Sequence, residues 1–427
     1  MSVDTTTPDR RLTKRQARLI LAAWALISFL VTICVLLAGG HSQVQSQAVQ
    51  EAPEKASPPP VANVAQPLVA DGFGYGIQVR AELGNVESTI GQVNQLGLNW
   101  VKQQVRWADI QPTPDEIYWE QLDPFIAQAN GAQLNVLLSI VSAPDWTRTS
   151  TSSGKTGPPD DFQDYADFVV ALLQRYPGQV QAVEVWNEQN LQREWYTVGG
   201  LSAARYVEML RLTYESVKAT DPDVIVVSGA LSPTGVDDGI IAIDDFDYLD
   251  QMIQAGLLAY TDCVGAHHTG VNLPPDVSAE EAFTVGAPEG TVFMGPYDPE
   301  NPLNPHHSWS FRSTLRGQHE RIVAAGGAQK LCVTEFGWPT MEGLGVDEAP
   351  PEFEFAWDNS LADQAAYTVQ AYQLLREWDI AQMAFLWNLD FAPKHEATID
   401  DNVLYSILAP DGTPRPAFHA IAAMPKD

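Results

Sequence analysis

QAVEVWNE, at residues 181–188, is a short β-rich run that ends in an amide and a carboxylate. A helical pattern precedes it at 160–176, with Asp160 as the expected N-cap, and another follows at 201–220. Strands that alternate with such helices predict a parallel sheet with crossover helices. The alternation extends in both directions, with further predicted strands at 73–79, 99–106, 134–141, 223–230, 262–269, 330–337 and 381–388.

Eight such strands with about eight helices indicate an α/β protein with a (β/α)8 TIM barrel. The competing architecture is a doubly wound open sheet, which commonly carries a glycine-rich phosphate loop after a strand. No GxGxxG or GxxxxGK[ST] motif follows any predicted strand, so the sequence favours the barrel. Two long connections, at about 270–311 and 340–359, follow strands six and seven at the face where barrel enzymes place their sites.

The N-terminal region has the composition of a membrane anchor. Residues 19–38 form an uncharged apolar run long enough to span a bilayer core of roughly 30 Å as a single transmembrane helix. The tail at 1–18 carries five Lys and Arg residues and 41–50 carries none, which predicts a cytoplasmic tail and an extracytoplasmic remainder. A cleaved signal peptide is the alternative, although its apolar core is usually only about 7–15 residues long.

Residues 39–66 are rich in Gln, Ser, Ala and Pro, so we expect a flexible linker there. The remaining 67–427 has a length that fits either one large barrel domain or two average ones, and the eight predicted strands favour the barrel. The formal net charge of −30 argues against a nucleic-acid partner, because binding to phosphates needs clustered Lys and Arg.

The chain has three cysteines, one in the apolar run (Cys34) and two on predicted strands (Cys263 and Cys332). No CxxC pair or Cys/His ladder is present, so the sequence indicates no structural zinc site of that kind. A disulfide between Cys263 and Cys332 is one alternative if this part of the protein lies outside the cytoplasm. Strand geometry rarely suits a disulfide, however, and we expect two buried free thiols.

Two carboxylates, Glu188 and Glu335, end the predicted strands four and seven. In a barrel these strand ends open on the same mouth, across the axis from one another. Two carboxylates so placed can act on one glycosidic bond, one as an acid and the other as a nucleophile. A structural ion pair is the alternative for either residue taken alone.

WNEQN (186–190) and TEFGW (334–338), together with Trp387 on strand eight, resemble the motifs of the clan A glycoside hydrolases. Within the clan, the chain is most similar to family 39, the family of β-xylosidases and exopolysaccharide glycosidases. The resemblance covers about 70–425 and includes a C-terminal segment, 405–416, that is similar to the final strand-to-helix ending of the family. It implies a retaining enzyme that cleaves O-glycosidic bonds of an extracellular oligo- or polysaccharide without a metal or an organic cofactor.

The resemblance also assigns roles, with Glu188 as general acid/base and Glu335 as nucleophile. Burial and the charge of Glu335 should raise the pKa of Glu188, so that it holds a proton at neutral pH. Retention implies carboxyl groups about 5–5.5 Å apart. Asn187 would contact the sugar 2-hydroxyl, and Trp387 would form the platform under the sugar at the bond-cleaving subsite.

Strand two supplies further candidates, because period-two alternation turns Lys102, Gln104 and Arg106 toward the barrel interior. In the clan an Arg on this strand fixes the nucleophile. Here Lys102 stands at the matching position and Arg106 lies a few residues on, which leaves the partner of Glu335 open. An ion pair with Glu184 is the alternative for Lys102.

His267 on strand six matches a His of the clan, but Thr269 stands where the clan has a Tyr. Trp146 and Trp338 fall at strand ends, and we expect both beside a sugar, since sugar CH faces pack on aromatic rings. Ordinary packing is the alternative for each Trp.

Two other functions use the same residues. One is a membrane-anchored barrel that binds glycans without cleaving them, because a fold does not guarantee an activity. The other is a transglycosylase, in which water reaches the intermediate poorly. β-Linked xylosides, glucans and a polysaccharide made by the cell itself are all compatible with the sequence.

Overall fold

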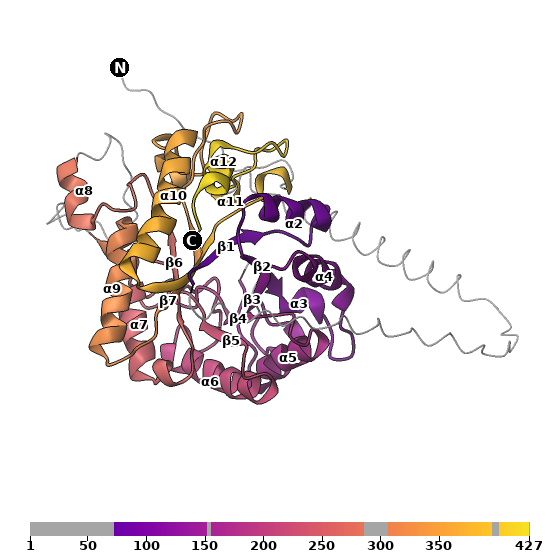
Figure 1. Cartoon of the computed structure of the whole chain (residues 1–427). Helices are drawn as coiled ribbons and strands as arrows, with labels where there is room; N and C mark the ends of the chain where they lie inside the picture. Colours follow the sequence, from indigo (N-terminus) through magenta and orange to yellow (C-terminus); the bar gives the residue numbers. More distant parts are fainter. Residues whose placement is uncertain (1–71, 152–154, 286–305, 395–400, 427) are drawn as a thin grey trace, which may run out of the picture. The chain divides into compact units, whose positions relative to one another are not determined.

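The computed structural model describes residues 72–151, 155–285, 306–394 and 401–426. Over these ranges strands and helices alternate, with the helices arranged around the strands (Figure 1). The predicted anchor at 19–38 and linker at 39–66 lie outside the described residues. Among the described helices, none is both long and apolar enough to cross a membrane.

The eight strands form one parallel sheet in the order β5-β4-β3-β2-β1-β8-β7-β6. The edge strands β5 and β6 meet through the isolated parallel bridges Val227–Cys263 and Leu231–Ala266, which bring the sheet close to full closure as a barrel. Each strand overlaps its predicted range, so the predicted (β/α)8 architecture is confirmed. The strands are β1 (Gly74–Val79), β2 (Trp100–Arg106), β3 (Asn135–Val141), β4 (Ala182–Val185), β5 (Ile225–Ser228), β6 (Val264–Thr269), β7 (Leu331–Gly337) and β8 (Ala381–Leu386).

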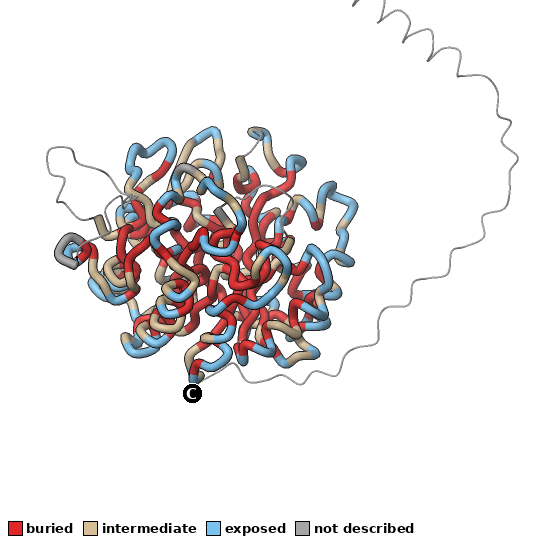
Figure 2. The backbone as a smooth tube through the Cα atoms, turned by 90° about the horizontal axis from the view of Figure 1, so that it is seen from above, coloured by how far each residue is buried: buried red, intermediate tan, exposed pale blue. Residues whose placement is uncertain are grey.

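The helices of the outer ring bury one face against the strands and expose the other, so that exposed residues lie at the rim (Figure 2). Asp161, not Asp160, caps α5, since its side chain accepts from the backbone N–H of Gln163. The longer helices are α2 (Val86–Gln95), α4 (Asp123–Gly131), α5 (Phe162–Arg175), α6 (Ala203–Thr220), α7 (Asp245–Gln254), α9 (Phe311–Ala324), α10 (Leu361–Trp378) and α12 (Pro416–Ala423). The short ones are α3 (Trp107–Ile110), α8 (Ala279–Val285) and α11 (Asp401–Leu404).

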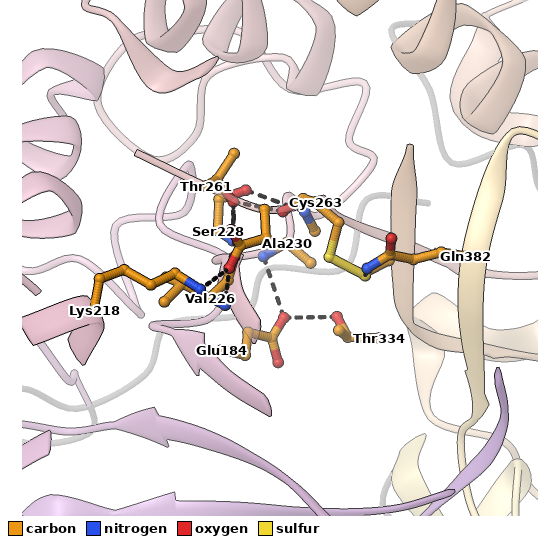
Figure 3. Close-up of a disulfide and its surroundings, with 12 residues drawn as sticks. Glu184, Lys218, Val226, Ser228, Ala230, Thr261, Cys263, Thr334 and Gln382 are labelled. Atoms are coloured by element: carbon orange, nitrogen blue, oxygen red, sulfur yellow. Dashed lines mark hydrogen bonds and ion pairs between the residues drawn. A yellow bond between two sulfur atoms is a disulfide. The ribbon is translucent and has the colours of Figure 1, made fainter. Parts of the chain in front are cut away.

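One end of the barrel interior is filled by a lower layer of buried side chains. Cys263 and Cys332 form a disulfide within it, so the expectation of two free thiols was wrong. Cys263 immediately precedes β6 and Cys332 is the second residue of β7, the neighbouring strand. Their Cα atoms lie 5.8 Å apart, within the range that a disulfide spans, and Figure 3 shows the bond at Cys263. The lower layer consists of Trp100, Leu137, Ala182, Val227, Cys263, Cys332, Met383 and Phe385.

The two long connections predicted after strands six and seven pack against each other. Val271, Leu273 and Ala282 from the first share an apolar cluster with Phe355, which lies in the short helix η5 (Pro351–Trp357) of the second. Trp309 belongs to the same cluster and lies in the short helix η4 (His307–Trp309), where it is 5% exposed. Trp309 therefore holds the two connections together by packing.

Candidate active site

A β-bulge in β7 determines which side chains enter the upper part of the barrel. The pairing of β7 with β6 shifts register between Ala266 and His267, and its pairing with β8 shifts between Val333 and Phe336. Two consecutive residues, Thr334 and Glu335, consequently both turn inward. Bulges often re-aim a side chain next to an active site, and this one directs Glu335 toward the barrel axis.

Lys102 of β2 joins two carboxylates inside the barrel. Its Nζ lies 3.0 Å from Oε1 of Glu335 and 3.3 Å from Oε2 of Glu184, and neither Lys102 nor Glu184 is exposed to solvent. The same Nζ donates to the carbonyl oxygen of Thr334 at 3.1 Å. Lys102 thus makes both contacts that the sequence left as alternatives. Burial lowers its pKa, but the two carboxylates more than offset this and raise the pKa above its ordinary value.

Thr334 links this ion pair to His267 of β6. Its hydroxyl donates to Oε1 of Glu184 at 2.6 Å and lies 3.0 Å from Nε2 of His267. Because the single hydroxyl proton is committed to Glu184, the Thr334 oxygen accepts from an N–H on Nε2 of His267. The other ring nitrogen, Nδ1, faces the two strand-end carboxylates.

The Nδ1 atom of His267 lies 3.3 Å from Oε1 of Glu188 and 3.8 Å from Oε2 of Glu335. Those two oxygens are therefore at most about 7 Å apart, the sum of the two distances. An imidazole between two carboxylates is stabilised in its protonated form. Burial lowers the pKa of His267, but Glu335 and Glu188 outweigh burial and raise it above its ordinary value.

Glu188 follows β4 on a tightly constrained backbone. Trp186 and Glu188 both adopt positive φ angles, 75° and 48°, which non-glycine residues rarely do and which cluster at functional sites. The backbone N–H of Glu188 donates to the carbonyl oxygen of Ala230 at 2.8 Å. The Asn190 side chain donates to the carbonyl oxygens of Ser232 and Ile243, which fixes the chain just beyond.

The expected rise in the pKa of Glu188 was wrong for this arrangement. Burial alone would raise it, but the hydrogen bond and charge of His267 and the charge of Arg193 lower it to about 2. Arg193 lies at the rim with a side chain 62% exposed, and its Nη2 is 3.1 Å from Oε2 of Glu188. Neither contact was predictable from the sequence, because the WNEQN motif gives no signal for a cation five residues after its Glu.

A cavity of about 910 Å³ opens above these carboxylates at the carboxyl ends of the strands. Asn187 is 7% exposed, and its Oδ1 has no hydrogen-bond partner among the described residues. Gln104 and Arg106 also lie in the wall, although Arg106 is exposed and pairs with Asp109. The predicted residues that line the cavity are Arg106, Asn187, Glu188, Glu335 and Trp387, with His267 and Lys102 in direct contact with the carboxylates from below.

Two predicted substrate contacts lie away from this cavity. Trp338 is 1% exposed, donates its indole N–H to the carbonyl oxygen of Leu273, and packs on Tyr367 of α10. The bulge shifts the inward–outward alternation by one residue, so Trp338 faces the helices. Trp146 is 37% exposed, donates to the carbonyl oxygen of Gln111, and packs edge-on against Trp107. In this structure both take the alternative role of packing residues.

Close to the cavity wall, one cluster among the described residues has the spacing of metal ligands, and it consists of Asp244, His306 and His307. It is separate from the carboxylates, whose described neighbours are the cations Lys102 and Arg193 and the imidazole of His267.

Several solved structures share this barrel fold. One is a family 39 glycoside hydrolase from the gut symbiont Bacteroides cellulosilyticus WH2, with a TM-score of 0.57 and 17% identity over 82% of this chain and 62% of that chain. A glucosidase from Croceicoccus marinus has a TM-score of 0.52 and 14% identity over 82% of this chain and 66% of that chain.

The exo-beta-1,4-mannosidase Op5Man5 from Opitutaceae bacterium strain TAV5 is similar at a TM-score of 0.51 and 15% identity, over 82% of this chain and 59% of that chain. The chain thus spans less than two thirds of each of these three proteins. No protein-family model and no curated protein sequence matches it. The structural likeness confirms the predicted resemblance to the clan A glycoside hydrolases at the level of the fold.

Proposed function

We propose that this protein is a retaining glycoside hydrolase that acts on an oligo- or polysaccharide, with Glu335 as nucleophile and Glu188 as general acid/base. The observation that carries the proposal is the convergence of both carboxylates on Nδ1 of His267 at the floor of the cavity. The limit of about 7 Å between Oε1 of Glu188 and Oε2 of Glu335 is compatible with the 5–5.5 Å between the carboxyl groups of retaining enzymes.

Lys102 supports the role of Glu335. A nucleophilic carboxylate must be ionised, and the ammonium lies 3.0 Å from Oε1 of Glu335, a residue that lines the cavity. In the first step Oε2 attacks the anomeric carbon and the bond to the leaving oxygen breaks. In the resulting ester Glu335 carries no charge. The electrostatic environment of Glu188 therefore differs between formation and hydrolysis of the intermediate.

Glu188 must deliver a proton to the leaving oxygen, yet its pKa in the free protein is depressed to about 2. We infer that Glu188 and His267 act as one titrating pair that holds a single proton, which rests on His267 before substrate binds. A bound sugar excludes water and displaces the exposed Arg193 from the rim, so the proton moves across the 3.3 Å from Nδ1 to Glu188. In the second step Glu188 takes the proton from the attacking water.

Two residues are suited to hold the sugar. The buried Oδ1 of Asn187 lacks a hydrogen-bond donor among the described residues, and a sugar 2-hydroxyl supplies one. Trp387 lies in the cavity wall, where its ring packs against Phe391 and offers a platform for an apolar sugar face.

The location proposed for the enzyme is outside the cytoplasm, anchored by residues 19–38. The disulfide between Cys263 and Cys332 supports this placement, because disulfides persist in oxidising compartments. The apolar run and the Lys and Arg residues before it support the orientation.

The proposal is tested by incubating the full-length protein with a panel of aryl β-glycosides and following the first product anomer by proton NMR. Retention gives the β-anomer first, whereas the α-anomer first would contradict the double displacement. Glu188→Gln should keep activity on a dinitrophenyl glycoside, whose leaving group needs no proton, and azide should accelerate it. Binding of glycans without turnover of any of them would identify a binding barrel instead.

A further inference from the structure

Two histidines and two aspartates converge beside the cavity, outside the residues assigned to glycoside cleavage. Asp244 and Asp245 stand at the start of α7, and His306 and His307 stand at the start of η4. Nε2 of His306 lies 3.3 Å from Oδ2 of Asp244, and Nε2 of His307 lies 3.6 Å from the same oxygen. His307 Nε2 is also 2.8 Å from Oδ1 of Asp245.

The two oxygens of the Asp244 carboxylate have different surroundings. Its Oδ1 caps α7 by accepting from the backbone N–H groups of Phe246 and Asp247. Its Oδ2 is buried and has no hydrogen-bond partner among the described residues, although two imidazole nitrogens face it. A buried carboxylate oxygen without a donor is costly, and a cation bound between it and the two imidazoles would remove that cost.

The spacing of these atoms suits a tetrahedral ion. Zinc bonds to His nitrogen and carboxylate oxygen are about 2.0–2.1 Å long, so two ligands on one tetrahedral ion lie about 3.3 Å apart. The two distances from Asp244 Oδ2, 3.3 and 3.6 Å, are close to this value, whereas each pair misses hydrogen-bond geometry. Nitrogen and oxygen ligands of this kind suit zinc and not magnesium or calcium, which prefer oxygen alone.

Surrounding contacts hold the ligands in this orientation, as outer-shell contacts do at metal sites. Nδ1 of His306 lies 2.7 Å from Oγ of Ser308 and 3.3 Å from the backbone N of Ser308. With zinc on Nε2, Nδ1 carries the ring proton and donates it to the Ser308 hydroxyl. The His307 ring stacks on Phe246, with ring centroids 3.5 Å apart. Asp245 accepts from Nε2 of Gln318 through Oδ2. A zinc ion on Nε2 of His307 would replace the hydrogen bond from that nitrogen to Oδ1 of Asp245, which makes Oδ1 the candidate fourth ligand.

We propose that Asp244, His306 and His307 form a zinc site that ties the segment entering α9 to the start of α7. The two helices are neighbours in the outer ring (Figure 1). Ser308, next to both histidines, lies in the wall of the cavity, so the ion would fix one side of the sugar-binding space. The site is separate from the proposed hydrolysis and does not depend on it.

The test uses the full-length, untagged protein stripped with a chelator and titrated with Zn²⁺ against a chromophoric competitor. We expect one tightly bound equivalent and a higher Tm with Zn²⁺. The double variant His306→Gln/His307→Gln should lose the equivalent and the Tm response while keeping the circular dichroism of the wild type.

The matched control is His319→Gln, which removes another histidine of the same region, on α9, without touching the cluster. It should retain the bound equivalent. Co²⁺ in place of Zn²⁺ should give the intense visible absorption of a tetrahedral site in the wild type and the control only. A wild-type protein that binds no Zn²⁺, or a double variant that binds it equally well, would overturn the proposal.

Discussion

The barrel interior is filled by two layers of opposite character. The lower layer is apolar apart from its disulfide and contains side chains from β2, β3, β4, β5, β7 and β8, together with Cys263 just before β6. The charged layer above it, defined here as Lys102, Glu184, His267, Thr334, Glu335 and Glu188, holds three carboxylates around one ammonium and one imidazole. Both layers occupy inward positions of the same strands, a few residues apart.

The difference shows how one barrel separates stability from chemistry. An apolar layer stabilises the fold wherever its side chains fill the volume, and substitutions there act through packing. In the charged layer each buried charge depends on a specific partner, because removing one partner leaves another charge uncompensated. The charged layer is therefore the more sensitive of the two to single substitutions that preserve volume.

The sharpest way to expose this difference is Lys102→Met. It leaves the buried Glu184 without its cation and Glu335 with only the His267 imidazole beside it, and we expect a loss of about 3–5 kcal/mol in the free energy of unfolding, measured by urea denaturation. Lys330→Met, which removes a solvent-exposed pair with Asp379, should change stability far less. Equal effects of the two substitutions would show that the charged layer is not a coupled unit.

The double variant Cys263→Ala/Cys332→Ala removes the disulfide from the lower layer. Removing a disulfide that spans 69 residues should cost about 2–4 kcal/mol of stability. Because the carboxylates lie in the other layer, kcat/KM at 20 °C should stay close to that of the wild type. Alkylation of the denatured, unreduced wild type should label Cys34 alone; labelling of Cys263 or Cys332 would contradict the pairing.

A smaller effect is expected from Thr334→Val, which keeps the volume of the side chain and removes its hydroxyl. Glu184 then loses a donor at 2.6 Å and His267 loses a partner at 3.0 Å, at a cost of about 1–3 kcal/mol. Thr334→Ser retains the hydroxyl and should recover most of the stability in the same urea measurement. A Ser variant no better than Val would assign the loss to packing.

The smallest effect concerns Arg193→Gln and its dependence on pH. A carboxyl pKa lowered from 4.5 to about 2 stabilises the fold above pH 4.5 and loses that contribution as pH falls toward 2. Without Arg193 the pKa of Glu188 rises, so less stability is lost over that window than in the wild type. Urea denaturation midpoints of the variant and the wild type, measured at several pH values between 6 and 3, give this difference in stability. Arg205→Gln, whose partner Glu208 lies on the outer face of α6, should leave the profile unchanged.

Sequence patterns predicted the strands well because a buried parallel strand is a continuous apolar run bounded by turns. Alternation along β2 also placed Lys102 inside the barrel, although the sequence left its partner open between Glu335 and Glu184. The sequence therefore predicted that β4 and β7 end at the same mouth of the barrel and that Glu188 lies there.

The β7 bulge was not predictable, because one extra residue leaves no mark in a period-two pattern. The bulge affects two of the residues predicted for the site. The bulge turns Glu335 inward beside Thr334, and the same shift turns Trp338 outward onto α10. The disulfide and the pKa of Glu188 depend on distances between strands and loops remote in sequence, which no local pattern encodes.

The role proposed for Glu335 as the nucleophile can be tested by trapping the glycosyl-enzyme intermediate. The full-length protein is incubated with 2-deoxy-2-fluoro glycosides that carry activated leaving groups, digested, and mapped by mass spectrometry. The predicted result is a single fluorosugar adduct on the peptide containing Glu335, absent from Glu335→Gln and still present in Glu188→Gln. An adduct on any other carboxylate, or turnover of the parent glycosides with no adduct at all, would contradict the assignment.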